Sequence, residues 1–196
     1  MLQIRIHGRG GQGVVTAAEL LSMAAFVNGK YAQAFPSFGS ERTGAPVLAF
    51  CRISEQPIRN REPVFTPDVL LLQDSTLLHQ MEVFSGLSPQ GQVLINSSKS
   101  LDQLHLTEFL TAHPTIKMYT LPASEMAINH LGRPLANAAL VAGCAAMTET
   151  FSEPAVEKAI REKFPGQLGE KNVAVAKEAY AHMLSLLAPV RKGPKP

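Results

Sequence analysis

The chain has 196 residues, 45% of them hydrophobic, which is enough material for the buried core of one ordinary domain. Its 18 Lys and Arg against 16 Asp and Glu leave a formal net charge of +2, so charge indicates neither nucleic acid nor a membrane surface as partner. The uncharged stretch 134–148 is shorter than the roughly 18 apolar residues of a spanning helix. No signal-peptide pattern opens the chain. We therefore expect a cytoplasmic protein with a single domain over 1–188 and a disordered tail over 189–196.

The chain starts with a predicted strand over residues 2–7, a glycine-rich turn and a very apolar helix. This helix is expected to begin at Gly13 or Val14 and to end at Asn28, with Gly29 as its C-terminal cap. Its few polar residues fall on one narrow stripe, so we expect burial on most faces. Such burial exceeds what a small domain alone normally provides, so we expect part of the surface of this helix to pack against a partner.

Strands and helices alternate through the middle of the chain. The predicted strands are 31–35, 47–53, 69–72, 92–95 and 116–120, and the predicted helices are 74–84 with its cap at Asp74-Ser75, 101–111 and 123–131. This alternation predicts an α/β fold with a Rossmann-like, mostly parallel sheet and helices on both faces. The last third is predicted to be helical, over 135–150, 153–164 and 169–187. The uncharged helix within 135–148 is expected to be core or a subunit interface.

Only two cysteines, Cys51 and Cys144, occur in the chain, and an iron–sulfur cluster needs four cysteine thiolates. They form no CxxC pair, and the six histidines show no ligand spacing. We expect neither a metal site nor a redox cofactor in this chain.

The run Gly8-Arg9-Gly10-Gly11-Gln12-Gly13 has GxGxxG spacing between a predicted strand and a predicted helix. Its backbone amides, the helix N-terminus and Arg9 are suited to holding a phosphate. The alternative is that the glycines only let the helix pack closely on the strand. Val14-Val15-Thr16 follows in place of the Lys-Ser/Thr of a Walker A loop, which excludes ATP hydrolysis of that type.

A nicotinamide site is disfavoured, because no acidic residue ends the second predicted strand. Glu41 is the nearest carboxylate and has Arg42 beside it, so a ligand with an extra phosphate stays possible. The loop 35–46 around this pair combines aromatic, hydroxyl and glycine residues, among them Ser37 and Ser40. Loops of this composition usually serve a site or an interface. The alternative is that the Phe residues of this loop only pack into the core.

Two stretches together carry a specific resemblance. Gly8–Ala17 and Ala34–Val47, with their separation, resemble the gamma subunit of pyruvate:ferredoxin oxidoreductase and related 2-oxoacid oxidoreductases. The segment Asn137–Gly143 resembles the small-residue helix of that family. The resemblance covers most of the chain.

The resemblance implies an assembly that decarboxylates a 2-oxoacid on thiamine diphosphate, passes electrons through iron–sulfur clusters to ferredoxin or flavodoxin, and releases an acyl-CoA. Thiamine diphosphate, Mg and 4Fe-4S clusters then belong to alpha, beta and delta-type or fused partner subunits. The gamma unit has a structural role and forms part of the coenzyme A site. The implied binding residues are Gly8, Arg9, Gly10, Gly11, Gln12, Gly13, Ser37, Ser40 and Arg42, with no catalytic or metal-binding residue.

Three alternatives remain open. In the first, the chain is a self-sufficient CoA- or nucleotide-binding domain, although no catalytic base can be named for it. In the second, it is the equivalent subunit of an indolepyruvate oxidoreductase. In the third, it is a scaffold whose glycine loop binds nothing. The sequence does not identify the 2-oxoacid, because substrate specificity is set around the thiamine in chains other than this one.

Overall fold

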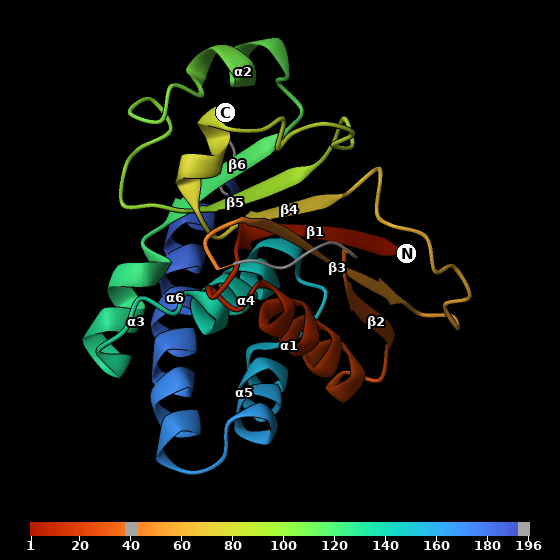
Figure 1. The fold of residues 1–196 in the computed structure, drawn as a ribbon, viewed down its shortest axis with the longest axis vertical. Helices are drawn as coiled ribbons and strands as arrows, with labels where there is room; N and C mark the ends of the chain where they lie inside the picture. Colours follow the sequence, from red (N-terminus) through yellow and green to blue (C-terminus); the bar gives the residue numbers. More distant parts are fainter. Residues whose placement is uncertain (38–42, 192–196) are drawn as a thin grey trace.

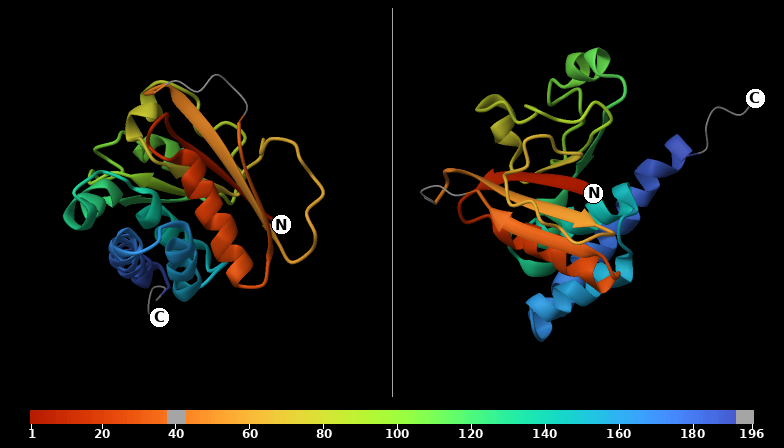
Figure 2. Two further views of the ribbon diagram at one scale, coloured as in Figure 1. Left: turned by 60° about the horizontal axis from the view of Figure 1, so that its bottom comes forward. Right: turned by 90° about the vertical axis from the view of Figure 1, so that its right-hand side faces the viewer.

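The structure is a computed structural model that describes residues 1–37 and 43–191. Ser40, Glu41 and Arg42 therefore lie outside the described residues, as does 192–196 of the predicted tail. The predicted tail begins within the last helix, α6 (Gln167–Arg191), which continues past the expected end at 187. Figure 2 shows α6 extending beyond the other helices toward the C-terminus.

Within the described part of the chain, six strands form one sheet in the order β2-β3-β1-β4-β5-β6 (Figure 1). The strands are β1 (Leu2–Arg9), β2 (Tyr31–Pro36), β3 (Pro46–Ser54), β4 (Val69–Leu72), β5 (Gln92–Asn96) and β6 (Lys117–Leu121). β1, β4, β5 and β6 are parallel, whereas β3 is antiparallel to both β1 and β2. The predicted mostly parallel sheet is confirmed.

Helix α1 (Val14–Val27) and the later helices cover one face of this sheet (Figure 1). The later helices are α3 (Ala123–Leu131), α4 (Asn137–Thr148), α5 (Glu153–Lys163) and α6. α5 begins as predicted, since the Ser152 hydroxyl accepts from the Ala155 amide and Pro154 stands in the first turn. The helical last third is therefore confirmed.

Helix α4 lies at the centre of this helical layer. Every residue from Asn137 to Met147 is buried, and α4 packs against α6, α1, α5 and β5 of its own chain. Of the two expectations for this helix, core or subunit interface, the structure confirms the core, because the chain itself covers it. Helix α1 is also covered mainly by its own chain, but Phe26 near its end is exposed.

The opposite face has a much thinner cover, and two helix predictions were wrong there. The segment predicted to be helical from 74 to 84 forms only a short 3-10 helix, η1 (Ser75–His79). It then continues in turns, with the Val83 amide donating to the Met81 carbonyl and the Ser85 amide to the Glu82 carbonyl. The carbonyls of Val83 and Ser85 accept from Arg5. The segment predicted over 101–111 contains only α2 (Thr107–Ala112). His105 has a φ of 58°, which a right-handed helix does not accommodate.

No helix in the described residues combines the length and the apolar character needed to cross a bilayer.

Candidate functional site

The glycine-rich loop joins the end of β1 to the start of α1. A Cβ on Gly8 would lie 2.6 Å from Val14 Cγ2, so this glycine lets the first turn of α1 approach β1 closely. Gly13 stands at the helix N-terminus with a φ of 74°, and no side chain caps the helix there. The first amides of α1 have no partner within the helix.

The loop is held by the carboxylate of Asp74, which follows β4. Asp74 Oδ2 accepts from Arg9 Nε at 3.0 Å and from Gln12 Nε2 at 2.8 Å. Gln12 Oε1 in turn accepts from the Arg9 amide at 2.8 Å. Burial acts to raise the pKa of Asp74, but hydrogen bonds from Thr76 and Gln12 and the charge of Arg9 outweigh it and keep that pKa below its ordinary value.

The Arg9 guanidinium is consequently already engaged. Besides Asp74 it donates to the Gly44 carbonyl, the Thr76 hydroxyl and the Gln80 side chain. The expectation that Arg9 adds a free positive charge to a phosphate site is thus weakened, because an incoming anion competes with a carboxylate 3.0 Å away. The amides of Arg9, Gly10 and Gln12 also donate within the chain, to the Gln12 side chain and to the carbonyls of Ala45 and Arg9. The amides in the first turn of α1 are therefore the more available donors.

A second contact locks the other end of the loop. The Asn137 side chain at the start of α4 packs against Gly13, where a Cβ would lie 2.4 Å from Asn137 Nδ2. Gln73 donates from Nε2 to Asn137 Oδ1 at 2.6 Å and to the Gln12 carbonyl at 3.3 Å. The loop, β4 and α4 therefore meet through two buried amide side chains.

Two hollows flank the loop, separated by Gln12. The glycine-loop hollow has a volume of about 310 Å³ and is lined by Arg9, Gly10, Gly11, Gly13, Val14, Val15 and Val47. The strand-end pocket has about 370 Å³ and is lined by Gln12, Gln73, Asp74, Ser75, Asn96, Ser97, Ser98, Lys99, Pro122, Ser124 and Glu125. The latter lies beyond the carboxyl ends of β4, β5 and β6, where open α/β sheets bind ligands.

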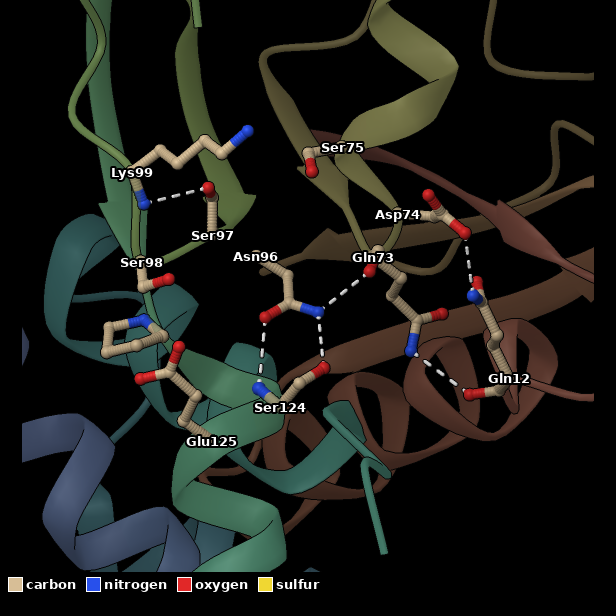
Figure 3. A pocket seen from close by; sticks show the side chains of 11 residues that line it. Gln12, Gln73, Asp74, Ser75, Asn96, Ser97, Ser98, Lys99, Ser124 and Glu125 are labelled. Carbon is tan, nitrogen blue, oxygen red and sulfur yellow. Dashed lines mark hydrogen bonds between the residues drawn. The ribbon is translucent and has the colours of Figure 1, made fainter. Parts of the chain in front are cut away.

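Figure 3 shows the strand-end pocket with Ser97 and Lys99 on one side and Asp74 and Gln12 on the other. Asn96 forms its floor: its Nδ2 donates to the Gln73 carbonyl and to the Ser124 hydroxyl, each at 2.8 Å. Its Oδ1 accepts from the Ser124 amide at 3.0 Å. Asn96 therefore ties β4 to the start of α3 and fixes the pocket wall.

Gln73 and Asn96 contribute to the site although they belong to no recognisable sequence motif. Both residues are polar and stand at the end of an otherwise buried parallel strand. That position was the available signal, because the carboxyl ends of parallel strands meet at one edge of the sheet. Ser97 and Ser98 follow β5 directly, and both line the pocket.

Of the other predicted binding residues, Ser37, Ser40 and Arg42, the structure describes only Ser37. Ser37 follows β2, and its amide donates to the Leu48 carbonyl at 2.9 Å. Ser37 lines neither of the two hollows beside the glycine loop. Ser40 and Arg42 belong to the undescribed segment, so their part in the site stays a prediction.

His7 lies next to the loop but is buried, with 3% of its surface exposed. Its Nε2 accepts from Arg5 Nε at 3.0 Å. Burial, with a smaller contribution from the Arg5 charge, lowers the pKa of His7 to about 3. The ring is therefore neutral at physiological pH and is a structural acceptor rather than a phosphate ligand.

The fold and the loop define a Rossmann-like α/β domain whose glycine-rich turn presents helix amides beside a polar pocket. The family described as pyruvate ferredoxin/flavodoxin oxidoreductase matches residues 3–182. The chain belongs to this family, and its resemblance to the gamma subunits is confirmed by the relatives that it matches.

Three relatives illustrate the match. The chain is 47% identical over 184 residues to pyruvate synthase subunit PorC of Methanocaldococcus jannaschii, covering 94% of this chain and 98% of the relative. It is 46% identical over 180 residues to the pyruvate/ketoisovalerate oxidoreductases common subunit gamma of Pyrococcus abyssi, covering 92% and 96%. The crystal structure of pyruvate oxidoreductase subunit PORC from Thermotoga maritima superimposes with a TM-score of 0.78 at 32% identity, covering 92% of this chain and 95% of that one.

Proposed function

We propose that the chain is the gamma subunit of a thiamine diphosphate- and iron–sulfur-dependent 2-oxoacid:ferredoxin oxidoreductase, which converts a 2-oxoacid such as pyruvate to an acyl-CoA. The observation that carries the proposal is the similarity to gamma-type subunits over nearly the whole of both chains, 94% and 98% in one case. The chain acts within a complex, and alone it is inactive.

Thiamine diphosphate, Mg and the clusters reside in alpha, beta and delta-type or fused partner subunits, and ferredoxin or flavodoxin accepts the electrons. The donor set of this chain does not fit a cluster. Both cysteines are buried in the core, and burial raises the pKa of the Cys144 thiol to about 12 and that of Cys51 further still. Within the described residues, no group of three or more His, Cys, Asp and Glu side chains is arranged to hold a metal ion.

The glycine loop contributes to the coenzyme A site. In support, Gly13, Val14 and Val15 at the start of α1 line the glycine-loop hollow, and a helix N-terminus stabilises a phosphate through its partial positive charge. Because Asp74 neutralises Arg9, these amides rather than the guanidinium carry the anion. The strand-end pocket beyond Gln12 adds hydroxyl and amide groups for the rest of a polar ligand.

The test is anaerobic purification of the tagged chain from its native host, with identification of the chains that copurify. The purified material is assayed for CoA-dependent reduction of viologen by 2-oxoacids. Copurifying chains with thiamine diphosphate and clusters, together with this activity, support the proposal. A chain that purifies alone and binds CoA or a nucleotide by itself contradicts it.

The CoA role is tested in the purified complex with Gly11→Ala, which adds a methyl group at the wall of the glycine-loop hollow. Gly29→Ala is the matched control, since both glycines have a positive φ, 91° and 76°, and Gly29 lies at the far end of α1 with open space around it. We expect a roughly five- to tenfold higher KM for CoA in Gly11→Ala alone, with kcat little changed. An unchanged KM would remove the loop from the CoA site and leave the subunit assignment intact.

A further inference from the structure

A surface groove lies between the end of α3 and the start of α6, on the side of the helical layer away from the sheet. We call it the α3–α6 groove; its volume is about 420 Å³, and it is lined by Leu131, Arg133, Leu135, Gln167, Leu168 and Lys171. It is separate from the glycine-loop hollow and from the strand-end pocket, with which it shares no lining residue.

Three leucines supply the apolar part of the groove, and Arg133, Gln167 and Lys171 supply its polar part. Leu135 is 36% exposed and Leu168 is 51% exposed, and Ile128 on the preceding turn of α3 is 49% exposed and extends the patch. Leu168 stands in the first turn of α6, next to the buried Gly169, where a Cβ would meet the Phe164 carbonyl oxygen. The backbone around Leu168 is thus fixed, and its side chain is presented to the outside on a rigid element.

The charges at the groove are of one sign. Arg133 and Lys171 are its charged lining residues, and neither forms an ion pair with any described residue. The carboxylates nearby on α6 are already used, since Glu170 pairs with Arg161 at 2.8 Å and Glu178 with His130 at 2.7 Å. Two uncompensated cations therefore flank an exposed leucine surface.

We infer that the α3–α6 groove is a docking site for an acidic amphipathic segment of a partner subunit. Aliphatic side chains of that segment fill the space between Leu131, Leu135 and Leu168, and its carboxylates pair with Arg133 and Lys171. Clusters of exposed apolar side chains with a polar rim are typical of protein interfaces, and the charge pattern selects an acidic partner. The inference rests on the proposed function in that it requires a complex.

The first test is charge reversal in the tagged chain, expressed in the native host and purified with its complex. The groove variant is Arg133→Glu with Lys171→Glu, and the control is Arg59→Glu with Lys158→Glu, two exposed cations elsewhere with the same change in net charge. We expect about tenfold lower recovery of at least one partner chain with the groove variant, and recovery like that of the natural chain with the control. Equal recovery with both variants overturns the inference, provided that the melting temperatures match.

A second test does not depend on the stability of the charge variant. A photo-reactive phenylalanine analogue replaces Leu168, whose exposed side chain is not required for the core, and the intact complex is irradiated. Cross-linking to a partner peptide that contains acidic and aliphatic residues supports the inference. Cross-linking to a second copy of this chain, or none in the intact complex, overturns it. If the natural chain brings down no partner at all, the proposed function itself has failed, which is a different result.

Discussion

At the scale of single residues, the buried pair of His7 and Arg5 makes stability depend on pH. Burial lowers the folded-state pKa of His7 to about 3, whereas the unfolded value is roughly 6.5. As pH falls through 6.5 the unfolded chain takes up a proton that the folded chain does not. The stabilisation is therefore complete above pH 6.5 and is lost progressively toward pH 3.

His7→Gln should remove this dependence, because a Gln carbonyl oxygen can still accept from Arg5 but does not titrate. Between pH 6.5 and pH 4 we expect the natural chain to lose about 3 kcal/mol more unfolding free energy than the variant. Urea unfolding at several pH values measures the difference. Parallel curves for the two proteins would show that His7 is protonated without cost in the folded state.

Gly13 illustrates how a positive φ and a close contact add. Gly13→Ala and Gly29→Ala both place a Cβ at a φ near 75°, which costs about 1 kcal/mol. Only at Gly13 does the new methyl meet another group, Asn137 Nδ2 at 2.4 Å. We expect Gly13→Ala to be about 2 kcal/mol less stable than Gly29→Ala in chemical denaturation. Equal losses would show that Asn137 moves aside freely.

At the scale of elements, the sequence predicted best where burial is regular. The strand Val69–Leu72 was predicted without error, because a short run of Val and Leu covered on both faces is typical of a parallel sheet. The helix Ala123–Leu131 was also correct, ending at Gly132 in a left-handed conformation. In both cases local preference and tertiary packing favour the same structure.

The segment predicted as helix from 74 to 84 instead continues after η1 in turns, and a distant side chain binds two carbonyls of this segment and its end. Arg5 lies about eighty residues before the carbonyls of Val83 and Ser85 that it binds, and no local pattern indicates such a contact. The candidate site was also predicted only in its local part. The spacing of the glycines identified the loop, but the ion pair of Arg9 with Asp74 joins residues 65 positions apart and has no local sequence signal.

The core position of α4 leads to a prediction for its single glycine. A Cβ on Gly143 would lie 2.8 Å from Leu94 Cδ2 and 3.0 Å from Leu121 Cδ2, both at the ends of flexible side chains. Gly143→Ala should therefore change stability little, while Gly143→Val should cost about 2 kcal/mol through overpacking. Ala181→Val on the exposed side of α6 controls for helix propensity, and thermal unfolding compares the three. A tolerated Val would indicate that α4 packs loosely on β5 and β6.

At the scale of the whole molecule, the two faces of the sheet are stabilised by different means. Helices bury one face through a large continuous apolar core. The face opposite α1 has a smaller apolar cluster over β4, β5 and β6, and two buried arginines also bind the connections that cover this face. Arg5 donates to the carbonyls of Val83 and Ser85, and Arg52 donates to those of Glu62 and Pro63. Neither arginine has a carboxylate within ion-pair distance among the described residues.

Arg52→Met tests this arrangement, because it keeps an unbranched apolar stem while removing the donors. Arg52 is 1% exposed, so two carbonyls lose a charged donor, and we expect a loss of about 3 kcal/mol. Hydrogen exchange should accelerate locally over residues 58–66 and remain unchanged in α4. Arg59→Met, an exposed arginine on the same connection, is the control and should behave like the natural chain. If exchange over 58–66 is unaffected in Arg52→Met, the buried side chain of Val64 holds the connection by itself, and the arginine contributes only to the sheet.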